Sequence, residues 1–177
     1  MLSAIFSIFL SLALSNEPTQ AHRFVEWHAN RKLTWNDFQG TPPPNPKAAA
    51  LTSTAIKIDF GYYHEALEYH LYCRFDQDAS WGKIRTGQVL AHEQGHFDIA
   101  EIYARKLNKA LSKFTPDPSQ IKREVNAIYD DMMKRYYEAQ DDYDLQTNFS
   151  IDIRQQQDWL KQIAKDLEDL RAYANYR

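Results

Sequence analysis

The sequence predicts an α+β fold in which a small antiparallel sheet is followed by three helices. From residue 50 to residue 75, apolar and polar residues alternate at a period of two, which is typical of strands with one buried face. After residue 83, apolar residues recur at helical spacing in three successive runs. The 177 residues are 44% hydrophobic and carry a net charge of −3, which is ordinary for one globular domain.

The predicted sheet consists of an early strand and a hairpin. The early strand is expected in the apolar-aromatic run at residues 24–27. Two alternating runs, residues 56–60 and 67–75, are separated by a turn at residues 61–64, so they are expected to pair as an antiparallel hairpin. The proline-rich residues 41–46 cannot form a helix or a central strand and are expected to be an extended connector.

The three helices are expected at residues 83–114, 117–140 and 152–170. The second begins with Asp117 as N-cap and Pro118 in the first turn, and the third with Asp152 followed by Gln155 three residues later. There is no internal repeat and no linker that would divide these elements. We therefore expect a single domain.

Residues 1–15 are predicted to be a signal peptide and residues 16–177 the mature domain. Residues 2–14 form an apolar run that is too short to span a bilayer comfortably, and it ends in the small-x-small sequence Ala13-Leu14-Ser15. A buried first helix is the alternative. The protein is thus expected to be secreted or periplasmic, without a stable membrane span after cleavage. The balanced charge argues against a nucleic-acid partner.

The motif His92-Glu93-Gln94-Gly95-His96 predicts a metal site on the first helix. Helical residues four apart lie about 40° apart around the axis and roughly 6 Å apart along it, so the two imidazoles can share one ion. Glu93 lies about 100° round from His92, where it can reach a water on the open side of the metal. This spacing is typical of zinc hydrolases, in which His92 and His96 would bind Zn²⁺ and Glu93 would be the general base.

The alternative interpretation is a chance pair of histidines. Apolar neighbours, including Leu90, Phe97 and Ile99, predict a largely buried helix, where histidine and glutamate side chains without partners are costly. Gly95 inside a helix costs about 1 kcal/mol relative to alanine, so we expect a packing or access reason for it. Both points favour the metal site.

The third ligand is not settled by the spacing. A catalytic zinc needs three protein ligands and an open position for water. No histidine follows His96, and Ile99 and Ile102 stand where the metzincin pattern requires glycine and histidine, which excludes that class. The third ligand is then an upstream histidine or a downstream carboxylate. Glu101 faces away on a straight helix, and the other carboxylates near the next helix are Glu124, Glu138, Asp141, Asp142 and Asp144.

Several segments resemble the bacterial family known as domain of unknown function 922. They are residues 90–101, residues 35–40, Ser80-Trp81, Tyr143-Asp144-x-x-Thr147 and Gln156-x-x-Trp159. The resemblance covers nearly all of the mature chain and is most specific in the extended motif. It implies a zincin-like fold and a secreted zinc-dependent protease that acts on peptide or protein substrates.

The family pattern continues Tyr-Asp-x-x-Thr-x-His-Gly, whereas this chain has Phe149-Ser150 at the last two positions. If that histidine is the ligand, this protein has lost it; if the aspartate is the ligand, Asp144 completes the site. We expect Asp144, with Zn²⁺ as the cofactor. Tyr143 or Tyr103 could donate to the oxyanion, although a buried aromatic role is the alternative for both.

We therefore expect an exported zinc metallopeptidase. One alternative is a catalytically degenerate, metal-binding envelope protein that acts by protein interaction, which the departure at Phe149 motivates. Another is a zinc amidase with a cell-wall substrate, because the motif specifies a hydrolytic water and not the acyl group that is presented to it.

Overall fold

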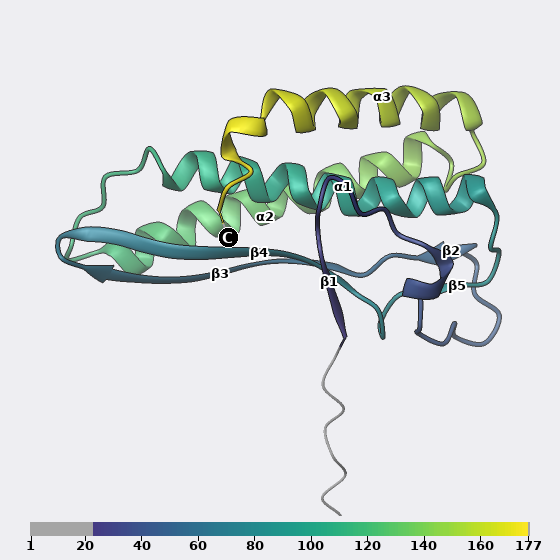
Figure 1. Ribbon diagram of the computed structural model, residues 1–177, viewed down its shortest axis with the longest axis horizontal. Coiled ribbons are helices and arrows are strands. Elements are labelled where there is room, and N and C mark those ends of the chain that lie inside the picture. The colour runs from purple at the N-terminus through teal and green to yellow at the C-terminus, as the bar shows by residue number, and fades with distance from the viewer. Residues whose placement is uncertain (1–22, 177) are drawn as a thin grey trace, which may run out of the picture.

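The computed structural model describes residues 23–176 and confirms the α+β arrangement (Figure 1). One antiparallel sheet has the order β1-β4-β3, and a second sheet pairs β2 with β5. The strands are β1 (Phe24–Glu26), β2 (Ala50–Leu51), β3 (Thr54–Tyr63), β4 (Ala66–Asp76) and β5 (Trp81–Gly82). The α-helices are α1 (Gly87–Leu111), α2 (Ile121–Gln146) and α3 (Ile153–Asp169), and two short 3-10 helices are η1 (Trp35–Asp37) and η2 (Arg171–Tyr173).

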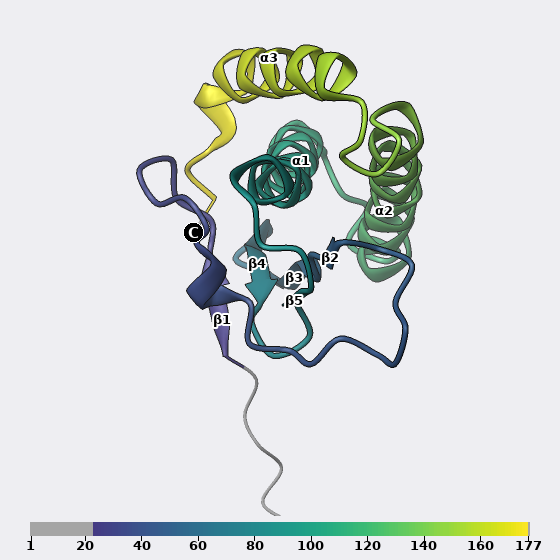
Figure 2. The same cartoon turned by 90° about the vertical axis from the view of Figure 1, so that its right-hand side faces the viewer.

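Helix α1 is the central element. Figure 2 looks along it and shows the strands on one side, α3 on the opposite side and α2 beside it. Most residues of α1 between His92 and Leu111 are buried, including charged ones. Because it is enclosed on several sides, α1 holds its polar side chains in fixed surroundings.

The hairpin forms as the alternation predicts. Ile56 lies opposite Cys73 in the register of β3 and β4, and both are buried together with Leu71. The turn, however, is at His64 and Glu65, whose φ angles are 49° and 64°, and not at residues 61–64. Positive φ at both central residues matches the twist of a two-residue hairpin turn, so the strands continue to Tyr63 and Ala66.

Helix boundaries differ from the prediction at two N-termini and two C-termini. Helix α1 ends at Leu111 and not at residue 114, because Ser112 is its C-cap. Helix α1 begins at Gly87 and not at residue 83, because the Thr86 hydroxyl accepts from Val89 N and the preceding residues pair as β5. Helix α2 begins after Gln120, since the Asp117 carboxylate accepts from Ser119 N in the turn before it.

Helix α2 also extends to Gln146, six residues beyond the predicted end at residue 140, so the predicted acidic cluster at residues 141–144 lies on the helix itself. Helix α3 begins as expected, with the Asp152 carboxylate accepting from Arg154 N and Gln155 N at 3.0 Å.

The predicted signal peptide lies outside the described residues. Within residues 23–176, no helix combines the length and the hydropathy that crossing a membrane requires.

A buried carboxylate attaches the N-terminal segment to α1. Asp98 accepts from the Trp27 indole at 2.7 Å and from Gln94 Nε2 at 2.8 Å, and it forms an ion pair with Lys32 at 3.2 Å. Gln94 Oε1 in turn accepts from Leu33 N at 2.7 Å. These bonds hold residues 27–33 against the same helical turns that carry the motif.

Gly95 has the packing reason that the sequence predicted. A Cβ atom at Gly95 would lie 2.4 Å from the Tyr143 hydroxyl oxygen and 2.7 Å from its Cζ atom. Real side chains do not approach so closely, so glycine at this position allows α2 to pack against α1.

We predict that Gly95→Ala lowers the free energy of unfolding by about 1 kcal/mol or more, because overpacking against Tyr143 outweighs the better helix propensity of alanine. Gly87→Ala on the same helix is the matched control, since a Cβ there meets nothing within 4 Å. Urea unfolding followed by circular dichroism measures both. Equal stability of the two variants would contradict the packing argument.

Candidate metal centre

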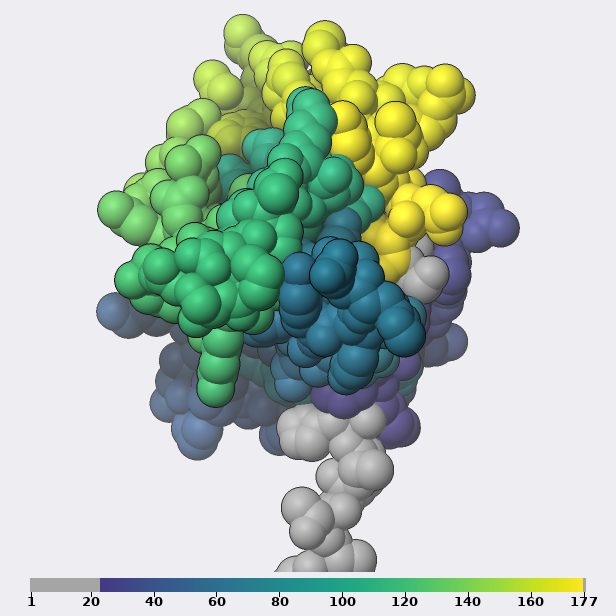
Figure 3. Space-filling model, turned by 90° about the vertical axis from the view of Figure 1, so that its left-hand side faces the viewer, coloured from purple at the N-terminus to yellow at the C-terminus, as the bar shows by residue number. Residues whose placement is uncertain are grey.

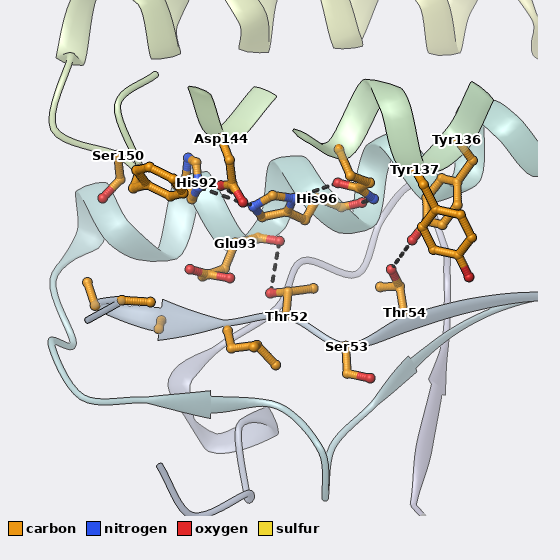
Figure 4. Close-up of a pocket in the computed structure, with 16 residues that line it drawn as sticks. Thr52, Ser53, Thr54, His92, Glu93, His96, Tyr136, Tyr137, Asp144 and Ser150 are labelled. Atoms are coloured by element: carbon orange, nitrogen blue, oxygen red, sulfur yellow. Dashed lines mark hydrogen bonds and ion pairs between the residues drawn. The ribbon is translucent and has the colours of Figure 1, made fainter. Parts of the chain in front are cut away.

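Three side chains from two helices converge on one point (Figure 4). His92 and His96 leave the same face of α1, and Asp144 comes from the last turns of α2. Asp144 Oδ1 lies 3.0 Å from His92 Nε2 and 3.1 Å from His96 Nε2, and the two Nε2 atoms are 3.1 Å apart. The structure therefore brings together the three residues that were predicted as ligands.

These three atoms have the spacing of a ligand set. Donor atoms that each lie about 2 Å from a zinc ion are about 3 Å apart. His92, His96 and Asp144 form a group that could hold a metal ion. The His92 side chain is 4% exposed, His96 is 13% exposed and Asp144 is 33% exposed, so an ion can enter from the Asp144 side.

The hydrogen bonds of His96 fix its tautomer. Gln140 Nε2 donates to the His96 carbonyl at 3.0 Å, which orients the amide so that Gln140 Oε1 faces His96 Nδ1 at 2.5 Å. His96 Nδ1 must then donate to this oxygen, because an amide oxygen only accepts. In the neutral imidazole, the lone pair therefore lies on Nε2 and points toward the centre.

His92 is held in a similar way, through a longer contact. The Thr147 hydroxyl donates to the Tyr143 carbonyl at 2.6 Å, which leaves its lone pairs free to accept. His92 Nδ1 lies 3.5 Å from this hydroxyl oxygen. The arrangement favours a proton on Nδ1 and a lone pair on Nε2, so both imidazoles present acceptors to one point.

Tyr143 supports both imidazoles from beneath. Its ring stacks on His92 with centroids 4.6 Å apart and an interplanar angle of 15°, and it meets the edge of His96 at 5.0 Å. The side chain is fully buried, and its hydroxyl donates to the His92 carbonyl at 3.3 Å. Tyr143 thus packs against the ligands, and Tyr103 packs on Tyr136; both have the aromatic role that was the alternative.

The surroundings of Asp144 favour an ionised carboxylate. Burial by itself would raise the pKa of Asp144, but its hydrogen bonds to His92 and His96 outweigh burial and hold that pKa below its ordinary value. Burial by itself would lower the pKa of His96, but the hydrogen bond to Asp144 and its charge outweigh burial. The pKa of His96 is therefore raised above its ordinary value. An anionic oxygen between two imidazoles is a suitable surrounding for a cation.

Glu93 is not one of the three donors. It leaves α1 on the side that faces Thr52, between β2 and β3 (Figure 4), and it is 4% exposed. Its Oε2 is buried and has no hydrogen-bond partner among the described residues. Burial raises the pKa of Glu93, although the neighbouring charges of His96 and His92 oppose this effect. A buried carboxylate oxygen of this kind requires a water or a ligand as its partner.

The centre opens into a cavity of about 420 Å³. Residues 48–54 form one wall, and α2 contributes Tyr136, Tyr137 and Gln140. His92, Glu93, His96 and Asp144 line the same cavity. The candidate metal ligands and the carboxylate therefore face a single space that a substrate could enter.

The other predicted carboxylates lie outside the group: Glu101, Glu124, Glu138, Asp141 and Asp142. Glu101 faces away, as expected, and accepts from Arg105 Nε at 2.9 Å and from the Tyr176 hydroxyl. Glu124 accepts from Asp117 N at 3.1 Å, and the remaining three are exposed on α2.

Sequence reasoning did not assign roles to Gln140 and Thr147, which hold the two imidazoles. Their spacing from Asp144, four residues before and three residues after, places all three on one face of α2. That spacing was the available signal. Phe149, which replaces the histidine of the family pattern, lines the cavity and is not needed to complete the three-donor group.

Comparison with known proteins identifies one family. The model of the family described as "Bacterial protein of unknown function (DUF922)" matches residues 10–150, a span that includes both sheets, α1, α2 and the connection after α2. No curated protein and no solved structure matches the chain.

We predict that Asp144→Ala weakens metal binding at least tenfold, because it removes the carboxylate that joins the two imidazoles. Asp142→Ala, two residues away on the same helix but exposed, should bind metal as the unaltered protein does. Metal content after dialysis and competition with a chromophoric chelator measure both. Equal affinities in the two variants would rule out Asp144 as a ligand.

Gln140→Leu should weaken metal binding by about tenfold to a hundredfold, because His96 Nδ1 loses the acceptor that fixes its tautomer. Glu138→Leu, exposed on the same helix, is the control. The same chelator competition reports both, and an unchanged affinity in Gln140→Leu would show that the amide does not set the tautomer.

Proposed function

This chain belongs to the bacterial family DUF922, and from that premise we propose that it is an exported zinc-dependent metallopeptidase. His92, His96 and Asp144 would hold the Zn²⁺ ion, and Glu93 would be the general base. The observation that carries the proposal is the combination of three converging donor atoms with a separate buried carboxylate on the same cavity.

The donor set fits zinc. Two imidazole nitrogens and one carboxylate oxygen are a common protein ligand set for catalytic zinc, which leaves a position for water. Two histidines and a carboxylate also suit non-haem Fe(II), but a buried glutamate beside the ligands favours hydrolysis. A zinc ion bound here would supply a Lewis acid and lower the pKa of a water.

Glu93 has the properties of a residue that moves a proton. Its unpartnered Oε2 is available to accept from a water, and burial, opposed by His96 and His92, raises its pKa above the ordinary value of a glutamate. After the water attacks the substrate carbonyl, the same carboxylic acid can deliver the proton to the leaving amine. The role of Glu93 is therefore general base first and general acid second.

The wall formed by residues 48–54 favours an extended peptide as the substrate. Lys83 N donates to Ala49 O at 2.9 Å and Asp76 N donates to Ser53 O at 2.8 Å, so the odd-numbered residues pair with β5 and β4. In an antiparallel strand, the N–H and C=O groups of successive residues point to alternate edges. Those of Ala50 and Thr52 therefore point away from β5 and β4, on the wall that lines the cavity. A peptide could pair with these groups as an added strand.

The alternative of a catalytically degenerate protein was based on Phe149, which the candidate metal centre does not use. Phe149 stands where the family pattern has histidine, but the three-donor group forms without residue 149. We therefore propose a hydrolytic enzyme. The backbone edge at residues 50–52, which could pair with an extended peptide, favours a peptide over a cell-wall amide as the substrate.

We predict that Glu93→Gln retains metal but lowers peptide hydrolysis by about a hundredfold to ten-thousandfold, because the amide cannot accept a proton. The measurement is zinc content together with cleavage of a quenched-fluorescent peptide library. Glu138→Gln, exposed on α2, is the matched control and should cleave at the unaltered rate. A zinc-loaded Glu93→Gln protein that cleaves the peptides at the unaltered rate would contradict this mechanism.

A further inference from the structure

Exposed apolar side chains concentrate at one end of the molecule. Among the described residues, nine large hydrophobic side chains are exposed, and six of these lie on or within two residues of β2, the β5–α1 connection and the α2–α3 connection. Figure 1 shows these three segments at the same end of the long axis, and Figure 2 looks onto that end. We name these six side chains the end face; they are 42–71% exposed: Leu51, Ile84, Leu145, Phe149, Ile151 and Ile153.

The segments of the end face are joined to one another. Gln88 Nε2 donates to Ser150 O at 2.5 Å, and Gln156 Nε2 donates to Gln88 O at 3.0 Å. These bonds attach the first turn of α1 to the α2–α3 connection. Leu51 and Phe149 also line the same cavity. The end face is therefore one surface and not three unrelated loops.

The α2–α3 connection holds its apolar side chains outward at a conformational cost. Asn148, Phe149 and Ser150 have φ angles of 47°, 52° and 72°, a region that residues with a Cβ atom rarely adopt in succession. Phe149 N donates to Asp144 O at 2.8 Å, which holds this backbone. Ser150 is buried, whereas Phe149 and Ile151 on either side of it are exposed.

Cations accompany the apolar side chains. Four exposed cations lie on these segments or next to them: Lys47 before β2, Lys83 and Arg85 in the β5–α1 connection, and Arg154 in the first turn of α3. Within the described residues none of them takes part in an ion pair. The acidic groups on the adjoining residues include Asp144 of the candidate metal centre, Asp152, whose carboxylate caps α3, and Asp141 and Asp142, which lie further back on α2. The chain as a whole carries −3, so this collection of cations is a local feature.

We propose that the end face binds the surface of an anionic lipid bilayer. Ile84, Ile151 and Ile153 would enter the boundary between headgroups and acyl chains, while Lys83 and Arg154 contact headgroup phosphates. The proposal does not depend on the hydrolytic activity. If both hold, the cavity opens beside the membrane, because Leu51 and Phe149 belong to both.

The composition favours a lipid surface over a protein partner. Protein interfaces are depleted in lysine and place several aromatic anchors in pockets, whereas this surface carries five aliphatic side chains, one aromatic side chain and exposed cations on the same segments or next to them. Figure 3 shows the opposite end, formed by the hairpin turn, the α1–α2 connection and the C-terminal segment. Of the nine exposed hydrophobic side chains, Tyr63 belongs to that hairpin end and provides the control.

The first test is co-sedimentation of the purified chain with vesicles of phosphatidylcholine alone or mixed with phosphatidylglycerol at about 3:1. Ile151→Ser/Ile153→Ser should lower partitioning at least tenfold. Lys83→Glu or Arg154→Glu should lower it about fivefold or more on the anionic vesicles, and less at high salt. Tyr63→Ser should change nothing. The N-terminal apolar run is the same in every variant, so the differences report on the end face.

The second test locates the contact directly. Ile153→Cys and Tyr63→Cys are each labelled with an environment-sensitive fluorophore, since the native Cys73 is buried. Anionic vesicles should shift the emission of the label at residue 153 to the blue and leave the label at residue 63 unchanged. Equal shifts, no shift, or partitioning that none of the end-face variants reduces would overturn the proposal. Self-association in sedimentation velocity that Ile151→Ser/Ile153→Ser abolishes, without vesicle binding, would assign this surface to a second copy instead.

Discussion

The candidate metal centre depends on the close packing of α2 against α1 at Gly95. The absence of a side chain there lets Tyr143 lie beneath both imidazoles and places the following residue, Asp144, between their Nε2 atoms. A larger residue at position 95 would push α2 away, and the acidic oxygen would leave the centre. One glycine on one helix thus sets the position of a candidate ligand that another helix supplies.

The central position of α1 makes this arrangement rigid. Asp98 faces the N-terminal segment, where Trp27 and Lys32 bind it, and Glu101 accepts from Arg105 on the next turn of α1 and from Tyr176 in the C-terminal segment. Buried charges are costly unless they are paired, and each of these carboxylates has partners from outside its own helical turn. The segments that contain Trp27 and Tyr176 are thereby attached to the helix that carries the motif, and the imidazoles are held in a scaffold with little freedom.

The two ends of the long axis carry different features. One end carries the exposed apolar and cationic side chains, of which Leu51 and Phe149 also line the cavity, and the other end carries the hairpin turn and the α1–α2 connection. The left-handed backbone at residues 148–150 links the two proposals, because it begins one turn after Asp144 and presents Phe149 to the cavity. A centre that hydrolyses peptides and a surface that binds lipid would then act on substrates close to a membrane.

The sequence by itself determined the local features of this protein. Alternation at a period of two specified the β3–β4 hairpin, and the four-residue spacing of His92 and His96 specified their common face, because both depend only on the geometry of a single element. The choice of Asp144 among the carboxylates was decided by tertiary structure. The family resemblance indicated Asp144, but the spacing of the motif could not. The position of the Asp144 carboxylate depends on how far α2 extends and on how α2 packs against Gly95. The pairing of β2 with β5, which shortens α1 at its start, likewise joins residues about thirty positions apart and leaves no periodic signal in either segment.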